Sequence, residues 1–212
     1  MAVHEITITV KTPLSLGSGQ ADVNIDADIV HDSYGLPYFP ARRFKGILYE
    51  SAVEAAEMAE LSQKPFLSRK TVEELFHHVD TADVQLVISN FYLRDYETMC
   101  RDWSQLQRQY GAYIRPDDVL ETYTSLRYQT ALDADTGTAR DGSLRNIRVL
   151  RAGTVFVGTI EVVHETPAYT QALALALQNM RAAGLKRNRG FGQIVCTMKN
   201  QAELVQAALQ AE

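Results

Sequence analysis

The spacing of apolar residues changes along the chain, and each change predicts a different element. Residues 4–11 alternate, with Ile6, Ile8 and Val10 on one side and polar residues between them. A period of two indicates a half-buried β-strand. After Pro40 the apolar and small residues instead fall on one helical stripe, and glutamates occupy the opposite side. We therefore expect a strand followed by a helix that packs on it.

The rest of the chain carries further signals of the same kind. Thr71 and Glu74 have the spacing of a capping box, which predicts the start of a short second helix. The other predicted elements are strands at 84–88, 153–163 and 193–198, and helices at about 169–182 and 204–209. This order predicts an α+β, ferredoxin-like (RRM-like) βαββαβ core in a single domain that spans residues 1–212.

The segment from about 94 to 150 interrupts this pattern. Met99, Trp103, Leu106 and Tyr110 are spaced as on one face of a helix. The remaining residues are rich in Asp, Arg, Thr and Gly and show no regular period. We therefore expect a long middle insertion in the core, carrying long loops.

The composition narrows the class of protein. The 212 residues are 46% hydrophobic and 22% charged, which is typical of a globular domain, and the formal net charge is −5. Cys100 and Cys196 match no metal or redox spacing, which fits a reducing compartment. There is no signal-peptide pattern and no run of about 18 apolar residues. These features predict a cytoplasmic protein without membrane contact.

Against this acidic total, residues 183–193 (AGLKRNRGFGQ) concentrate positive charge on a glycine-rich turn. Glycines let a backbone approach a ligand closely, and Lys186, Arg187 and Arg189 suit phosphate groups. The alternative is a glycine helix cap whose solvated cations complement the helix C-terminus. The turn alone does not separate these two interpretations.

A second basic segment, PARRFKG, places Arg42, Arg43 and Lys45 at a predicted helix start. Cations at this end oppose the helix dipole, so the placement costs stability unless an anion offsets it. A phosphate bound at the helix N-terminus would be such an anion. The mismatch favours a binding role over an exposed basic turn.

The third segment, NIDADIVHD, is acidic. If it is extended, Asp26, Asp28 and Asp32 share one face and His31 points to the other. Carboxylates beside a phosphate-binding surface could hold a divalent cation that assists phosphodiester cleavage. On spacing alone, a polar hairpin is the favoured alternative.

Taken in order, five motifs resemble the RAMP superfamily of CRISPR effector proteins. The motifs run collinearly from about Ile6 to Met198, and they are most similar to the backbone (seven-group) RNase subunit of type III complexes. They are TPLSLGSGQ, IDADIVHD, GLPYFPARRFKG, ALDADTGTARDGSLRNIRVLRAGTVFVGTIEV and GLKRNRGFGQ.

The resemblance implies an RRM-like fold and a role in antiviral defence. It implies binding of guide RNA (crRNA) by repeated copies in a filament with other CRISPR effector subunits, and pairing of the guide with target RNA. It further implies endonucleolytic cleavage of the target that depends on a divalent metal ion such as Mg²⁺. A loop within the middle insertion would separate guide–target base pairs.

Family motifs carry over to particular positions. Asp26 matches the catalytic, metal-supporting aspartate. Arg127 and Arg145, at the edge of the insertion, are further candidates for RNA contacts. The positions implied to bind RNA are Arg42, Arg43, Lys45, Gly46, Lys186, Arg187, Arg189, Gly190 and Gly192.

The chain also departs from the family pattern. Small hydroxyl residues are usual where Ala41–Arg43 stand, a cation is usual where Tyr49 and Glu50 stand, and Asp28 is an additional acid. Two alternatives therefore stay open: a noncatalytic RAMP subunit that binds guide RNA or caps the complex, and a ferredoxin-like domain that binds a small anion or a protein.

Overall fold

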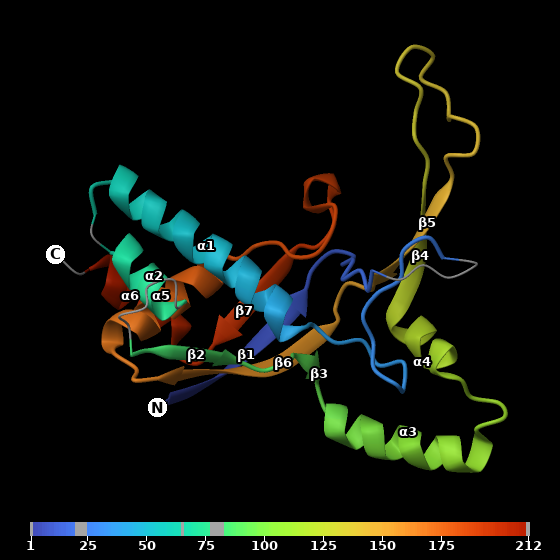
Figure 1. Ribbon diagram of the computed structural model, residues 1–212, viewed down its shortest axis with the longest axis horizontal. Helices are drawn as coiled ribbons and strands as arrows, with labels where there is room; N and C mark the ends of the chain where they lie inside the picture. Colours follow the sequence, from blue (N-terminus) through green and yellow to red (C-terminus); the bar gives the residue numbers. More distant parts are fainter. Residues whose placement is uncertain (1, 20–24, 65, 77–82, 211–212) are drawn as a thin grey trace.

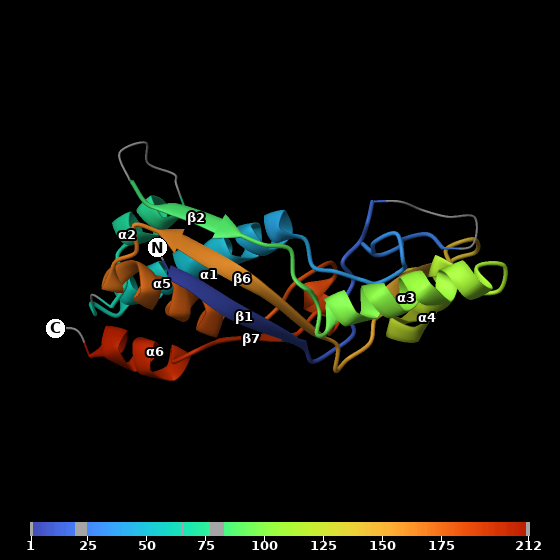
Figure 2. The same cartoon turned by 90° about the horizontal axis from the view of Figure 1, so that it is seen from below.

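An antiparallel sheet with helices packed on one of its faces forms the body of the molecule (Figures 1 and 2). The computed structural model describes residues 2–19, 25–64, 66–76 and 83–210. The main sheet has the order β2-β6-β1-β7, and β3 pairs with β6 beside this path. Its strands are β1 (Ala2–Val10), β2 (Gln85–Ile88), β3 (Tyr92–Leu93), β6 (Val155–Val163) and β7 (Ile194–Met198).

Two helical connections give this sheet its topology. Helix α1 (Ala41–Leu61) leads from β1 toward β2, and α5 (Pro167–Asn179) leads from β6 to β7. The strand that each connection reaches is not the neighbour of the strand it leaves, because β6 lies between β2 and β1, and β1 lies between β6 and β7. This is the split βαβ arrangement of a ferredoxin-like fold, and the predicted α+β class is confirmed.

Strand β1 is the centre of the core. It pairs antiparallel with β6 along one edge and with β7 along the other. Ile6, Ile8 and Val10 are fully buried. Burying each such side chain contributes roughly 1.5–3 kcal/mol, so the alternation seen in the sequence sets which face of β1 meets the helices.

Helix α1 begins directly after Pro40 and has no side-chain cap and no acidic residue in its first turn. The Asn90 side chain takes the place of a cap, since its Oδ1 accepts the Ala41 N–H at 2.9 Å. Phe44 and Leu48 are fully buried on the helix face that was predicted to pack inward. The basic entry to α1 is therefore held by a residue from a distant loop, and the cations have no acid beside them in that turn.

The second helix was placed incorrectly by the capping-box pattern. Helix α2 spans Arg69–Leu75, and its N-cap is Ser68, whose side chain accepts the Thr71 N–H at 3.1 Å. Thr71 is thus the third residue of the helix rather than its cap. Ser68 is the cap because its hydroxyl lies about one helical turn before Val72, the first buried residue of the helix.

The middle insertion is more regular than the sequence suggested. The predicted helix is present as α3 (Tyr96–Tyr110), but a second helix and a β-hairpin occupy the region expected to form long loops. These are α4 (Pro116–Tyr123), β4 (Thr124–Gln129) and β5 (Arg145–Leu150). The hairpin projects from the body, drawn in olive and yellow in Figure 1.

The hairpin strands could not be predicted from the sequence, because buried and exposed residues do not alternate along them. In β4 Leu126 and Tyr128 are exposed, whereas the last four residues of β5, from Ile147 onward, are all buried. Helix α4 has only eight residues, and Asp118 caps it by accepting the Arg115 N–H at 2.8 Å. A last helix, α6 (Gln201–Leu209), ends the described chain.

Candidate nucleic-acid interface

The glycine-rich turn after α5 has a backbone that only glycine fits. Gly184, Gly190 and Gly192 have φ values of +77°, +77° and +75°. A Cβ on Gly184 would lie 2.4 Å from the Ser15 carbonyl oxygen, and one on Gly192 would lie 2.0 Å from the Ala183 carbonyl oxygen. Both distances are far below contact, so the glycines close the turn tightly against the chain. Their first role is to shape the turn that presents the cations.

The turn and the start of α1 meet in one pocket of about 360 Å³. Arg42, Arg43 and Gly46 line it from α1, and Gly184 and Arg187 line it from the turn. The loop that follows β1 closes a third side. The two basic segments recognised separately in the sequence are therefore one surface.

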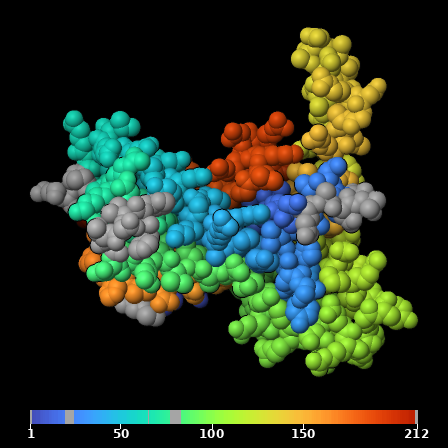
Figure 3. Space-filling model, viewed as in Figure 1, coloured from blue at the N-terminus to red at the C-terminus, as the bar shows by residue number. Residues whose placement is uncertain are grey.

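A second pocket, of about 600 Å³, lies on the other side of the turn. Lys186 and Arg189 line it from the turn, and Gln129 and Arg145 line it from the base of the hairpin. Figure 3 shows the turn, in orange-red, rising between α1 and the hairpin. The turn therefore contributes cations to a pocket on each of its sides.

Charge on the hairpin side of the turn is concentrated. The ammonium of Lys186 donates a hydrogen bond to the Gln129 side chain. Burial, followed by the nearby charges of Arg189 and Arg145, lowers the pKa of Lys186. Within the described residues none of these three cations forms an ion pair. An anion bound between these cations would be favoured by their combined charge.

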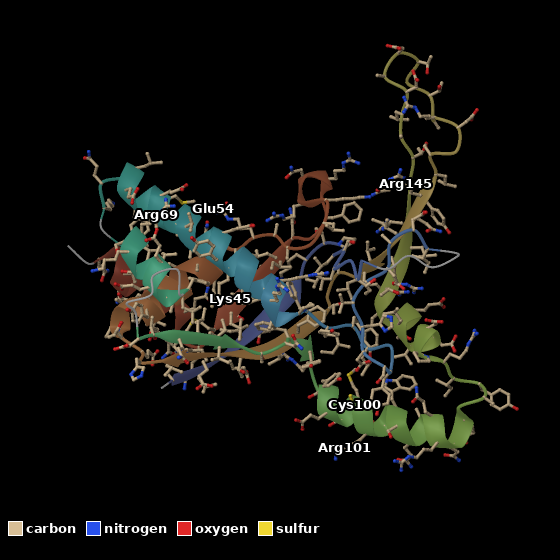
Figure 4. The ribbon with its side chains drawn as sticks, in the orientation of Figure 1. Lys45, Glu54, Arg69, Cys100, Arg101 and Arg145 are labelled. Carbon is tan, nitrogen blue, oxygen red and sulfur yellow. The ribbon has the colours of Figure 1, made fainter. Side chains whose placement is uncertain are left out.

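Not every predicted cation faces a pocket. Lys45 is half-buried on α1 and lines neither of the two pockets, although it lies on the helix beside them (Figure 4). Nη1 of Arg187 lies 3.4 Å from Oε2 of Glu50. Glu50, one of the departures from the family pattern, thus has a partner within this chain.

Gly46 differs from the glycines of the turn. It lies inside α1 on the exposed side, and a Cβ added there would meet nothing within 4 Å. A glycine inside an exposed helix costs about 1 kcal/mol relative to alanine. Nothing in the described protein requires glycine at this position, so the open space belongs to the pocket.

The acidic segment does not place its three aspartates on one site. Asp26 is exposed; its Oδ2 accepts the Asn146 N–H at 2.7 Å, and its own N–H donates to Asn146 Oδ1 at 2.9 Å. Asp28 Oδ1 lies 3.0 Å from Nε of Arg148. Arg148 is only 6% exposed, and its Nε has no directed hydrogen bond in the described chain, so this contact is a charge pairing.

Asp32 is a structural residue. Its Oδ1 accepts the N–H groups of Tyr34 and Leu36 at 2.8 and 2.9 Å, which fixes the turn before α1. Its Oδ2 accepts the Tyr96 hydroxyl at 2.7 Å. Burial, together with that hydrogen bond to Asp32, raises the pKa of Tyr96 well above its usual range. The expectation that Asp32 lies beside Asp26 as a metal ligand therefore finds no support in the geometry.

Of the three aspartates, Asp26 is the one whose side chain is exposed, so it is the candidate for holding a metal ion. No group of three or more His, Cys, Asp or Glu side chains in the described ranges is placed to hold a metal ion. Mg²⁺ commonly keeps several waters and uses one or two carboxylates together with substrate phosphates. Asp26 fits that mode of binding, and only that mode.

The sequence identified the candidate binding residues but not the residues that pair with them. Asn146, Arg148 and Gln129 all lie on the hairpin, whose strands were not predicted. Glu50 was predicted to face water and was noted as a departure from the family pattern, but its ion pair with Arg187 was not predicted. Among the described residues, no helix is both long enough and apolar enough to cross a bilayer.

Comparison with known proteins defines the class. The RAMP superfamily model matches residues 7–195, and the chain belongs to that superfamily. No curated protein matches the sequence.

Among solved structures, similarity extends over nearly the full length. One is a chain of the type III-B Cmr-β complex bound to cognate target RNA, solved by cryo-electron microscopy. It has a TM-score of 0.66 and 11% identity, with 97% of this chain and 99% of that chain covered. Another belongs to the apo state of type III-B Cmr-β, with a TM-score of 0.63 and 12% identity over 93% and 97% of the two chains. At these identities the likeness shows the shared fold.

Proposed function

We propose that this RAMP protein is a subunit of a type III CRISPR effector complex and that it binds guide RNA across the turn between α1 and the hairpin. The observation that carries the proposal is the pocket shared by Arg42 and Arg43 of α1 and Arg187 of the turn. Membership of the superfamily and the fold shared with subunits of Cmr-β complexes support it. Repeated copies of the chain would follow the guide, and target RNA would pair with it.

The electrostatics favour a phosphate chain over a single small anion. Cations line both pockets flanking the turn, and Lys186, Arg189 and Arg145 lie close together without an ion pair to any described acid. Each phosphate that a protein cation neutralises releases condensed counterions and so adds to the salt-dependent affinity. A polyanion is able to reach both pockets at once, whereas one small ion would leave one of them unpaired.

We further propose that the protein cleaves the target RNA with the help of Asp26. A hydrated Mg²⁺ would be held by the Asp26 carboxylate and a target phosphate, and it would stabilise the charge that develops on the phosphoryl group. Asp26 is exposed and bound to the hairpin strand, which suits contact with RNA lying beside the hairpin. The nucleophile would be the 2′-hydroxyl next to the scissile phosphodiester. Its oxygen would lose its proton and bond to phosphorus as the bond from phosphorus to the 5′-oxygen breaks, which leaves a 2′,3′-cyclic phosphate and a 5′-oxygen that takes up a proton.

One observation favours a noncatalytic subunit as the second candidate. Asp28 is engaged by Arg148, and Asp32 is engaged by the turn before α1 and by Tyr96. Asp26 is then the single carboxylate of the segment left for a metal. A subunit that binds the guide without cutting would need none.

The binding proposal is tested with the full-length chain and single-stranded RNA. The double variant Arg42→Ala/Arg43→Ala should weaken binding by about 10–100-fold at low salt and reduce the slope of log K against log salt by about 1–2. Arg69→Ala/Lys70→Ala removes the same charge from α2, whose Arg69 lies far along the body from the pocket (Figure 4), and should change affinity less than about twofold.

The outcomes separate the candidates. Equal losses in both double variants would mean that RNA binds only through overall charge. A chain that retains no RNA even at low salt would point to the small-anion alternative. For cleavage, the RNA-bound protein purified from its own cells is given a labelled RNA complementary to the co-purified strand. Cutting by wild type but not by Asp26→Ala supports the nuclease, and no cutting by either supports the noncatalytic subunit.

A further inference from the structure

Residues 26–28 run along the hairpin and are joined to it by a single β-bridge. Ala27 is bridged to Ile147 of β5 in parallel register. The Asp26 N–H donates to the Asn146 carbonyl at 3.2 Å, and the Arg148 N–H donates to the Ala27 carbonyl at 3.0 Å. The segment that carries the candidate catalytic residue is therefore not a free loop, since its backbone is paired with β5.

Side chains strengthen this pairing at both ends. Asn146 Oδ1 accepts the Asp26 N–H at 2.9 Å, while the Asn146 N–H donates to Asp26 Oδ2 at 2.7 Å. Two residues further along, Asp28 pairs with the buried Arg148. Asn146 is the one residue in this pairing that contacts both the amide and the carboxylate of Asp26. It therefore fixes the side chain as well as the backbone.

The opposite edge of the segment is held by the loop after β1. The Ser18 N–H donates to the Asp28 carbonyl at 2.7 Å, and the Val30 N–H donates to the Leu16 carbonyl at 2.9 Å. That loop also lines the pocket beside Arg42 and Arg43. The Asp26 segment is thus enclosed between the cationic pocket and the hairpin.

We propose that Asn146 is a positioning residue for Asp26, and that β5 is the element that aims the Asp26 carboxylate at the RNA. The inference rests on the proposed nuclease function and adds the residue that orients its carboxylate. A carboxylate on a short exposed segment has several rotamers, and the backbone N–H of residue 146 favours the one in which Oδ2 faces β5. The Asn146 side chain keeps the carboxylate within reach of that N–H, because its Oδ1 holds the Asp26 amide against β5. Misplacement of a reacting group by about 1 Å can cost 100-fold in rate, so fixing this rotamer matters for cleavage.

Amide hydrogen exchange in the full-length chain, without RNA or metal, measures the attachment directly. In Asn146→Ala, peptides covering residues 25–29 should exchange about 5–10-fold faster, because a hydrogen bond to Asp26 is lost. Asn146→Asp keeps an oxygen that accepts the Asp26 N–H but places a second negative charge beside the Asp26 carboxylate, so exchange there should fall between that of wild type and that of Asn146→Ala. Leu144→Ala, at a side chain that is 69% exposed beside the same strand, is the control and should change nothing.

Cleavage is then measured in single turnover with saturating Mg²⁺ and labelled target on the RNA-bound protein. Asn146→Ala should slow cleavage by about 10–100-fold, with the RNA dissociation constant within about twofold of wild type. If that variant unfolds the hairpin, seen as fast exchange in β4, Asn146→Ser takes its place. Unchanged exchange at 25–29, or an unchanged rate in a protein that cleaves, overturns the proposal. If the wild type does not cleave, the nuclease function fails, and the exchange result still decides whether Asn146 orders Asp26.

Discussion

Arg187 of the turn and Glu50 of α1 form an ion pair at the pocket between these two elements, with 3.4 Å between Nη1 and Oε2. Both side chains are partly exposed, at 46% and 59%, so the pair adds little to stability. Under the proposed function, its effect falls on RNA binding instead. Glu50 would neutralise a cation of the proposed RNA surface, and its own charge would repel phosphate.

We expect Glu50→Gln to tighten RNA binding by about 3–10-fold at low salt, because Arg187 is released and a repulsive charge is removed. Binding is measured by fluorescence anisotropy over a range of salt concentrations. Glu60→Gln makes the same charge change on the same helix, away from the pocket lining, and should leave affinity within about twofold. Equal gains in both variants would assign the effect to net charge.

Gly46→Ala should separate stability from binding. The added Cβ meets no protein atom within 4 Å, and alanine favours the helix by about 1 kcal/mol, so the free energy of unfolding should rise by up to that amount. RNA affinity should fall about 10-fold, because the methyl group occupies space that the RNA backbone enters. Urea unfolding and anisotropy measure the two effects. A stabilised variant with unchanged affinity would show that RNA does not approach α1 here.

Lys186 has a left-handed backbone, with φ of +61°. Lys186→Ala and Lys186→Gly both remove the ammonium, but only glycine relieves the backbone strain. The glycine variant should be more stable than the alanine variant by about 1 kcal/mol, while both lose RNA affinity to a similar degree. Different affinities in the two variants would indicate that the turn geometry, rather than the ammonium, governs binding.

Removing the charge of Asp26 and removing that of Asp28 should have different effects on stability and on cleavage. Asp28→Asn leaves Arg148 with a buried unpaired charge and should lower the free energy of unfolding by about 3 kcal/mol. Asp26→Asn, at an exposed position, should cost about 1 kcal/mol or less. Cleavage should be lost in the Asp26 variant. If Asp28→Asn folds stably and abolishes cleavage, Asp28 is the catalytic acid instead.

Glu165 predicts how stability depends on pH. Burial alone would raise its pKa, but hydrogen bonds from Thr170 and His4 outweigh it, and the pKa of Glu165 is lowered from its usual 4.5. The carboxylate therefore contributes stability that is complete above about pH 4.5 and is lost as the pH falls through the lower folded-state pKa. Urea unfolding at pH 7 and at pH 3–4 should show a smaller acid loss in Glu165→Gln than in wild type. Identical losses would place the acid sensitivity elsewhere.

The sequence predicted the elements whose burial alternates or repeats with a helical period. Strand β1 and helix α1 are examples, because one face of each meets the core. It failed at the hairpin, where β5 is buried over four consecutive residues while β4 exposes Leu126 and Tyr128. It also placed the cap of α2 at Thr71, since it did not weigh Ser68 three residues earlier.

The candidate site was predictable in its charges but not in its pairings. The cations of α1 and of the turn were recognised from composition and from the cost of cations at a helix start. Asn146 and Arg148 could not be found, because a local pattern carries no information about a partner 120 residues away. The three aspartates looked equivalent in an extended segment. Asp26 and Asp28 differ through those distant partners, and Asp32 differs through Tyr96 and the turn that follows it.

The glycine-rich turn and Asp26 are attached to different parts of the molecule. The glycine-rich turn is closed against the body through Ser15, whereas Asp26 is fastened to a strand of the projecting hairpin. Under the proposed function, substitutions that alter the angle or length of the hairpin would shift the carboxylate relative to a guide bound at α1. RNA binding at α1 and cleavage at Asp26 would then change separately, and one activity would be lost while the other is kept.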